Sequence, residues 1–209
     1  MVRVKVCGIT NLNDALITVK AGADAVGFIL YPKSKRFIKA KEVRRITQGL
    51  PPFIFKVGVF VNEDLHAILE ILSYANLDFA QLHGDESPEE CEYIGKERVI
   101  KVFRLKSIDE VEKIEPYIGK IRALLLDTYS ESSYGGTGKT FNWEIARAVK
   151  ERFPQIPLIL SGGLNPENVR DAIKEVNPYA IDVSSGVERA PGIKDREKVE
   201  LFIRRAKCE

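Results

Sequence analysis

The stretch VRVKVCGIT (Val2–Thr10) sets the pattern for the whole chain. Valines alternate with two cations and then Cys7, so one face of the expected strand is apolar and the other presents a thiol after the charged side chains. Gly8 then frees the backbone to turn, and Thr10 or Asn11 can cap a helix that begins at once. A thiol in this position lies at the carboxyl end of its strand, which is where ligands bind in α/β proteins.

The rest of the chain repeats this strand-then-helix pattern. The predicted strands cover residues 2–7, 23–30, 55–61, 78–83, 98–103, 122–127, 156–160 and 179–183. Strands that are linked by helices run parallel, and eight of them close a (β/α)8 barrel. We therefore predict an α/β protein with one domain, a single (β/α)8 TIM barrel over residues 1–209. An open doubly wound sheet is the alternative, although such sheets usually have about five or six strands.

Two of the expected helices carry the same start signal. Ser87 with Glu90, and Ser107 with Glu110, fit the capping box, in which a serine and a glutamate three residues later bond to each other's backbone N–H. We expect both helices to be capped in this way.

Composition limits the classes of partner. The 209 residues include 32 Lys and Arg and 30 Asp and Glu, a net charge of +2 that is too balanced for a dedicated nucleic-acid or membrane-surface binder. The first residues lack the apolar run of a signal peptide, and no stretch approaches the roughly 18 apolar residues of a membrane span. The three cysteines show no CxxC spacing, which argues against a disulfide framework and a zinc site. We expect a cytoplasmic protein that binds a small molecule and uses neither a metal nor a cofactor. The apolar Pro51-Pro52-Phe53 segment would support a homodimer, but a monomer is equally permitted.

Closure of a barrel would bring distant polar residues to one rim. Cys7, His83, Asp127 and Asp182 each end a predicted strand, and the alternation of side chains turns all of them toward the barrel axis. Arg36 lies in the basic loop that follows the second strand. A thiol and a carboxylate that face each other across a narrow barrel mouth are suited to paired acid–base catalysis.

Glycines and serines follow the seventh and eighth strands. Gly162 and Gly163 come after one, and Ser184, Ser185 and Gly186 after the other. In barrels of this kind the two loops commonly bind a phosphate through backbone N–H groups, because glycine lets the backbone approach the anion. The alternative is that these glycines only make tight turns.

The segment Gly135–Thr140 (GGTGKT) superficially resembles a nucleotide-binding P-loop. The P-loop pattern requires glycine where this chain has Ser133, and it directly follows a strand, whereas Lys139 and Thr140 end a long loop. We interpret residues 128–140 as an active-site loop instead.

The ordered motifs resemble the phosphoribosylanthranilate isomerases of tryptophan biosynthesis. The matching segments are Lys5–Thr10, Gly22–Phe28, Tyr31–Arg36, Val57–Asn62, Gln81–Gly84, Leu126–Thr128, Gly135–Phe141, Leu160–Asn168 and Asp182–Glu188. This resemblance implies an Amadori rearrangement of N-(5-phosphoribosyl)anthranilate, in which an aminoaldose becomes an aminoketose.

The resemblance also implies roles for individual residues. Asp127 matches the family's general acid, Cys7 its general base, and Arg36 a residue that contacts the anthranilate carboxylate. His83 and Asp182 are expected to line the site and bind substrate, although a structural role for His83 is as well supported. We further expect Asp127 to have a raised pKa, and Cys7 to have either a lowered pKa or a thiolate that forms on substrate binding, with Lys5 supplying positive potential beneath the thiol.

Other readings of the same residues remain. The family of the sugar-nucleotide isomerase of histidine biosynthesis has an Asp/Asp pair at comparable places, and that of indole-glycerol-phosphate synthase has a Lys/Glu pair. The Cys/Asp pair of this chain therefore disfavours both families. Outside enzymes, the chain could be a silent phosphometabolite sensor or a thiol redox sensor that uses Cys7.

Overall fold

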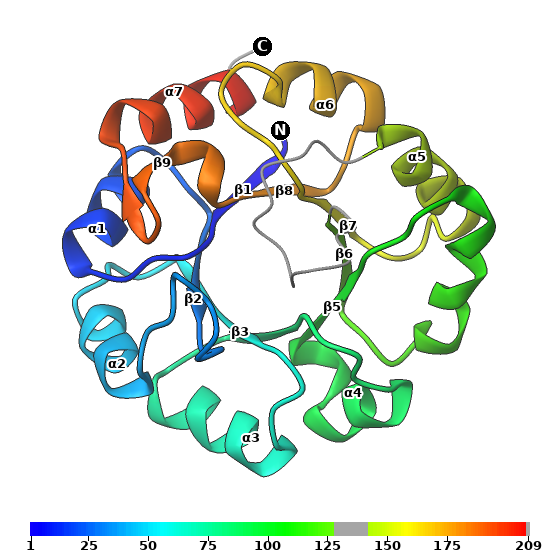
Figure 1. Cartoon of the computed structure of the whole chain (residues 1–209), viewed down its shortest axis with the longest axis horizontal. Coiled ribbons are helices and arrows are strands. Elements are labelled where there is room, and N and C mark those ends of the chain that lie inside the picture. Colours follow the sequence, from blue (N-terminus) through cyan, green and yellow to red (C-terminus); the bar gives the residue numbers. More distant parts are fainter. Residues whose placement is uncertain (128–141, 208–209) are drawn as a thin grey trace.

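The structure is a computed structural model that describes residues 1–127 and 142–207. Eight parallel strands follow one another around a closed barrel in chain order, with β1 paired to β8 (Figure 1). The strands are β1 (Arg3–Val6), β2 (Ala25–Ile29), β3 (Phe55–Phe60), β4 (Phe79–Leu82), β5 (Val99–Phe103), β6 (Ala123–Leu126), β7 (Leu158–Leu160) and β8 (Ala180–Val183). Each of them lies inside a predicted strand, which confirms the barrel and rules out the open sheet.

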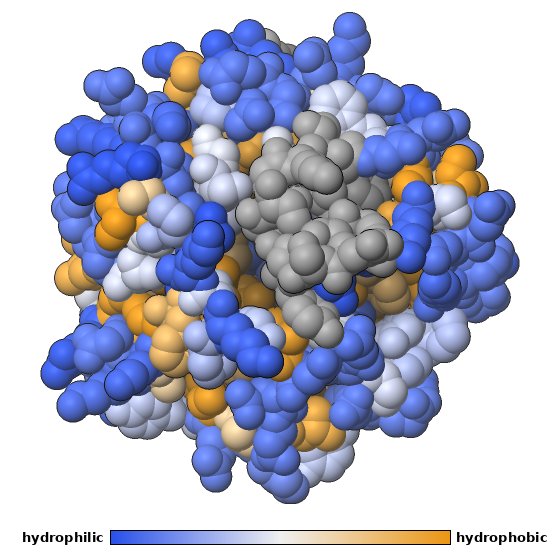
Figure 2. Space-filling model, viewed as in Figure 1, coloured by the Kyte–Doolittle hydropathy of each residue, from blue (hydrophilic) through white to orange (hydrophobic). Residues whose placement is uncertain are grey.

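Helices surround the barrel on its outside (Figure 1). They are α1 (Leu12–Lys20), α2 (Ala40–Gln48), α3 (Leu65–Tyr74), α4 (Pro88–Ile94), the 3₁₀ helix η2 (Ile108–Tyr117), α5 (Trp143–Arg152), α6 (Val169–Val176) and α7 (Arg196–Lys207). Short additions are the 3₁₀ turns η1 (Lys96–Arg98) and η3 (Ser185–Val187), and the antiparallel hairpin of β9 (Glu188–Ala190) and β10 (Ile193–Lys194). Hydrophilic residues cover the periphery of the face in Figure 2, over these outer helices.

The apolar side chains form two separate layers because successive residues of a strand point to opposite sides of the barrel wall. The outer layer lies between strands and helices and includes Val4, Leu82 and Leu124. The inner layer fills the barrel itself with Val57, Ile100, Val102, Ala123, Leu125, Ile159 and Ala180. This inner plug closes the barrel below the polar residues at its carboxyl end.

Only one of the two expected capping boxes forms. Ser87 accepts a hydrogen bond from the backbone N–H of Glu90 at 3.2 Å, and Glu90 accepts one from the backbone N–H of Ser87 at 2.6 Å. The second prediction was wrong: Ser107 makes no cap hydrogen bond, and the helix that follows is 3₁₀ rather than α. The carboxylate of Glu110 reaches past Ser107 to the backbone N–H of Lys106 at 2.7 Å, so the reciprocal pair is never made.

The described residues contain no helix with both the length and the apolar character needed to cross a membrane. The interpretation of residues 128–140 as an active-site loop, including the P-loop-like segment, falls outside the part of the chain that the structure describes.

Candidate active site

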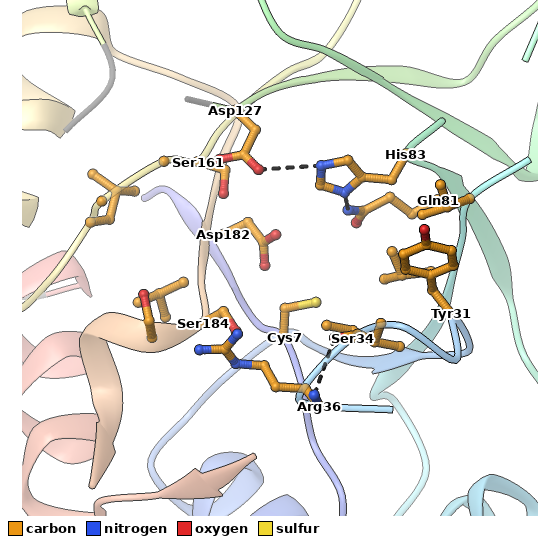
Figure 3. A pocket seen from close by; sticks show the side chains of 18 residues that line it. Cys7, Tyr31, Ser34, Arg36, Gln81, His83, Asp127, Ser161, Asp182 and Ser184 are labelled. Atoms are coloured by element: carbon orange, nitrogen blue, oxygen red, sulfur yellow. Dashed lines mark hydrogen bonds and ion pairs between the residues drawn. The ribbon is translucent and has the colours of Figure 1, made fainter. Parts of the chain in front are cut away.

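A pocket lies at the carboxyl end of the barrel, where the predicted site residues meet. Cys7, Arg36, His83, Asp127 and Asp182 all line it (Figure 3). They come from the ends of β1, β4, β6 and β8 and from the loop after β2, and they are far apart in sequence. The inward direction that alternation predicted for the four strand-end residues is therefore confirmed.

Cys7 is held in a space that two glycines keep open. Gly8 has a φ of +79°, and a Cβ on it would lie 2.7 Å from Cδ of Arg36 and 3.0 Å from Oγ of Ser184. A Cβ on Gly27, in the neighbouring strand β2, would lie 2.7 Å from Sγ of Cys7. The 2.7 Å distance at each glycine is too short for a real contact of a Cβ atom. The absence of a side chain at Gly8 and Gly27 therefore leaves space for the thiol, Arg36 and Ser184.

A buried ion pair lies beneath the thiol, inside the barrel. The strand register places Lys5 beside Asp182, and Nζ of Lys5 donates to Oδ1 of Asp182 at 2.9 Å, with both side chains about 5% exposed. Burial alone would lower the pKa of Lys5, but the charges of Asp182 and Cys7 together raise it, so Lys5 remains a cation.

Of the two possibilities expected for Cys7, the lowered pKa was wrong, whereas thiolate formation on substrate binding stays a prediction. Burial raises the pKa of the Cys7 thiol above its ordinary value, and Asp182 adds to the increase. Lys5 and Lys194 act in the opposite direction, as expected for Lys5, but they do not outweigh the loss of water around the sulfur. The thiol is therefore neutral near pH 7.

Asp127 lies opposite Cys7 across the pocket and next to His83. Its Oδ2 is 3.3 Å from Nε2 of His83, while Nδ1 of His83 is 3.4 Å from Nε2 of Gln81 (Figure 3). All three side chains are buried. A chain of polar groups thus runs from the inward face of β4 to the carboxylate at the end of β6, which fixes where that carboxylate points.

The two glycine- and serine-containing loops lie side by side on the pocket wall. Gly162 and Gly163 both have positive φ, 86° and 69°, and they line the pocket together with Ser184 and Ser185. The buried hydroxyl of Ser184 has no hydrogen-bond partner among the described residues. Backbone that only glycine adopts easily and an unused buried donor both suit an anion.

Gly186, also predicted to bind phosphate, does not line the pocket. A Cβ on this residue would lie only 2.0 Å from the carbonyl oxygen of Leu164. Its position indicates why a glycine is needed there: the loop after β8 packs directly on the backbone of the loop after β7. Gly186 brings the two loops together.

Arg36 reaches the pocket from the loop after β2 but is already bound to a carboxylate. Its Nε donates to Oε1 and Oε2 of Glu188 at 2.9 and 3.0 Å, and its Nη2 donates to Oε2 at 2.7 Å. The neighbours Lys33 and Lys35 are exposed.

The sequence reasoning missed several residues at this site. Tyr31, Ser34 and Ser161 line the pocket without having been singled out, and Glu188 holds Arg36. Tyr31 and Ser34 lie within the motif that ends at Arg36, so proximity could have suggested them. Glu188 ends the matching segment Asp182–Glu188, but nothing local indicated its pairing with Arg36, which is 152 residues away.

The arrangement can carry out acid–base chemistry on a small phosphorylated molecule. The carboxyl group of Asp127, the thiol of Cys7 and the guanidinium of Arg36 line one pocket, together with the loops after β7 and β8, which suit an anion. Among the described residues, no group of three or more His, Cys, Asp or Glu side chains is arranged to hold a metal ion.

Comparison with known proteins identifies the family. Residues 4–205 match the family model described as N-(5'phosphoribosyl)anthranilate (PRA) isomerase. A relative named N-(5'-phosphoribosyl)anthranilate isomerase, from Geobacter metallireducens, is 52% identical over 208 residues, which is 100% of both chains. The chain belongs to the phosphoribosylanthranilate isomerase family. The resemblance read from the motifs is thereby confirmed, and the chain is an isomerase.

Solved structures of phosphoribosylanthranilate isomerases share the fold. The enzyme from Thermotoga maritima is 52% identical, with a TM-score of 0.91 and 99% of each chain covered. A further structure of that enzyme, 46% identical with a TM-score of 0.86 over 99% of each chain, is described as monomers of a dimeric protein. A third structure, 48% identical with a TM-score of 0.86 over 99% of each chain, is a complex with reduced 1-(o-carboxyphenylamino)-1-deoxyribulose 5-phosphate.

Proposed function

We propose that this chain converts N-(5-phosphoribosyl)anthranilate into 1-(2-carboxyphenylamino)-1-deoxyribulose 5-phosphate, a step of tryptophan biosynthesis. The observation that carries the proposal is the joint presence of Cys7 and Asp127 on one pocket that also contains the two glycine- and serine-containing loops. Membership of the phosphoribosylanthranilate isomerase family supports it, as does the ligand named for the third solved structure, which has the skeleton of the product.

In the proposed mechanism Asp127 is the general acid and Cys7 the general base. Asp127 gives its proton to the ring oxygen of the ribose, the C1–O bond breaks, and the nitrogen lone pair forms an iminium at C1. Cys7 then removes the proton from C2, and the electrons of that C–H bond form the enolamine. The enolamine then takes up a proton at C1 while its C2 hydroxyl gives up a proton, so that the C2–OH becomes the carbonyl of the aminoketose. No electron acceptor or second reactant is needed, since the step only moves protons and electron pairs within one molecule.

The electrostatic surroundings of Cys7 support its role as a base that is activated by charge. The neutral thiol must become a thiolate before or during proton removal, and Lys5 is the cation that favours this change. Because Lys5 lies below the sulfur inside the barrel, its charge acts on the thiol without occupying the pocket.

The remaining polar residues are assigned to substrate binding. Gly162, Gly163, Ser184 and Ser185 bind the phosphate through N–H and O–H groups, and Gly186 brings the second loop into place. Arg36 binds the anthranilate carboxylate, for which a planar fork of N–H donors is well matched. His83 and Asp182 form hydrogen bonds to the sugar part of the substrate.

We infer that the protein works in the cytoplasm, because a catalytic thiol needs a compartment in which cysteine stays reduced.

We also infer a homodimer that forms through the amino-terminal end of the barrel. Met1, Phe53, Phe55 and Tyr179 lie at this end, next to the starts of β1, β3 and β8, and are 98%, 103%, 50% and 48% exposed. Phe53 has a φ of 65°, an unfavourable backbone conformation for a residue with a side chain. A cavity of about 180 Å³ opens beside them and is lined largely by apolar residues such as Val57, Phe79 and Ile159. Exposed aromatic side chains next to an apolar cavity favour self-association.

The proposed activity is tested with Cys7→Ser and Asp127→Asn. Each variant should lower kcat by about 10²–10⁴-fold, the range typical of losing a general acid or base, while leaving the affinity for the reduced product analogue within a few-fold of wild type. Turnover is followed by the fluorescence of the anthranilate group and binding by calorimetry.

The same experiment separates the enzyme from its rivals. A silent sensor would bind the analogue without turnover even as the wild type, and a redox sensor would lose its response only with Cys7→Ser. An Asp127→Asn variant with unchanged kcat would contradict the assignment of the acid.

A further inference from the structure

Arg36 is bound along one side by a buried carboxylate, which fixes the direction of its guanidinium. The side chains of Arg36 and Glu188 are 12% and 5% exposed, and three N–H···O contacts of 2.7–3.0 Å join them. Glu188 uses the edge formed by Nε and Nη2. The opposite edge of the guanidinium, with Nη1, remains for a ligand in the pocket that Arg36 lines.

Glu188 is itself fixed by contacts within the β9–β10 hairpin. Nζ of Lys194 donates to Oε1 of Glu188 at 2.8 Å, and the backbone N–H of Gly192 donates to the same oxygen at 3.3 Å. The side chain of Lys194 is fully buried. Arg36 and Lys194 together hold the pKa of Glu188 below its usual value against the effect of burial, so the carboxylate stays charged and available to Arg36.

Lys194 connects this contact to the catalytic end of the barrel. Its Nζ also donates to the carbonyl oxygen of Cys7 at 2.6 Å and to that of Ser184 at 3.3 Å. One ammonium group therefore touches the residue with the catalytic thiol, the loop assigned to phosphate binding and the carboxylate that holds Arg36. A displacement of Lys194 would disturb all three together.

The hairpin is anchored on its other side to the start of α1. Oγ1 of Thr10 donates to the carbonyl oxygen of Gly192 at 2.5 Å, and the backbone N–H of Lys194 donates to Oδ2 of the buried Asp14 at 2.8 Å. These contacts hold the hairpin but do not involve Arg36. They make it possible to separate the integrity of the hairpin from the orientation of the arginine.

The charges of this group leave room for an anion. Arg36 and Lys194 both contact the carboxylate of Glu188, and of these two cations only Arg36 lines the pocket. A carboxylate of the substrate at the free edge of Arg36 would complete two pairs of opposite charge.

We propose that Glu188 and Lys194 are positioning residues that make the site selective for an arylamine carrying a carboxylate. They hold the free edge of Arg36 toward the position of the aryl ring, so the enzyme favours the carboxylated substrate over one that lacks the carboxylate. This inference rests on the proposed function and deepens it by naming the residues that set the specificity for the aryl group.

The test compares two ligands in wild type and in Glu188→Gln, which keeps the shape of residue 188 and removes its charge. The ligands are the reduced product analogue with its aryl carboxylate and the same compound made from aniline, which has none. Glu188→Gln should weaken binding of the carboxylated ligand by about tenfold or more, since a charge-assisted bond is lost or misdirected, and change binding of the aniline ligand by less than about twofold. With the carboxylated substrate the loss should appear in KM more than in kcat.

Thr10→Val is the matched control. It removes the contact between Thr10 and the hairpin without touching Arg36, and it should leave the ratio of the two affinities at the wild-type value. If Glu188→Gln does not fold, Glu188→Asp, which keeps the charge on a shorter side chain, replaces it. The ratio of the affinities for the two ligands is then measured in that variant.

Two results would overturn the inference. One is an equal loss of affinity for both ligands in Glu188→Gln. The other is a change in the ratio of the two affinities in Thr10→Val that is as large as in Glu188→Gln. Either result would mean that the contact between Glu188 and Arg36 is purely structural. Failure of the proposed function looks different, because wild type would then not turn over the substrate, whether or not it bound the carboxylated ligand.

Discussion

At the scale of single residues, the site depends on groups that are buried together and adjust one another. Cys7 has a pKa raised by burial, and Lys5, which is paired with Asp182, opposes that increase from beneath. Gly27 contributes by having no side chain, since a Cβ there would collide with the sulfur. The local sequence could indicate that Lys5 lies near the thiol. The direction of the pKa shift of Cys7, however, depends on how much water the complete fold removes from around the sulfur.

Replacing Lys5 with Met should raise the pKa of Cys7 further. Lys5 favours the thiolate through its charge and a hydrogen bond, so its removal leaves desolvation less opposed. The pH dependence of iodoacetamide alkylation, followed by mass spectrometry of the peptide that contains Cys7, measures the change. The alkaline rise of kcat/KM should move to higher pH in parallel.

Cys91 serves as an internal reference for this experiment, because burial raises its pKa to about 12 and it should stay unreactive in both proteins. The double variant Lys5→Met with Asp182→Asn separates the loss of the cation from the effect of leaving a carboxylate unpaired. An alkylation profile for Cys7 that is the same in wild type and Lys5→Met would disprove the role of Lys5.

At the scale of elements, the capping-box pattern predicted a helix cap correctly only where the glutamate had no other backbone N–H to bind. The Ser87 box forms and begins α4, with Pro88 at its first position as favoured there. The equivalent pattern at Ser107 gives no cap because the carboxylate of Glu110 binds the N–H of Lys106 instead.

The two serines make a matched pair for a stability measurement. Ser87→Ala should lower the free energy of unfolding by about 1 kcal/mol, the usual cost of losing an N-cap. Ser107→Ala should change it by less than about 0.5 kcal/mol, because no cap bond is lost. Urea denaturation followed by circular dichroism gives both values, and equal losses in the two variants would contradict this assignment of the caps.

At the scale of the whole molecule, the two ends of the barrel have different tasks. The carboxyl end gathers the polar site, the inner apolar layer fills the middle, and the amino end exposes aromatic residues beside an apolar cavity. The division follows from the parallel arrangement, in which all strand ends of one kind lie on the same side. It allows two copies to associate through one end while both sites stay open.

Phe53→Asp should convert the proposed dimer into monomers. Burial of each phenylalanine is worth roughly 1.5–3 kcal/mol, and a twofold interface contains two, so the dimer should be weakened by at least about 100-fold. Sedimentation velocity over a range of concentrations measures the effect. Tyr93→Asp, at another exposed aromatic residue, on the side of the barrel, is the control and should not change the association. A wild type that sediments as a monomer at every concentration would refute the dimer.

The sequence by itself determined the barrel, the family and the set of residues that meet at its carboxyl end. These follow from patterns that repeat locally, since alternation fixes the face of each side chain and helical links fix parallel strands. Only the tertiary structure decided that Glu188 and Lys194 orient Arg36, that Gly27 makes room for the thiol, and that the pKa of Cys7 is raised. Contacts between side chains of different strands and loops, and the removal of water from around a charged group, exist only once the barrel has closed. No local pattern in the chain encodes them.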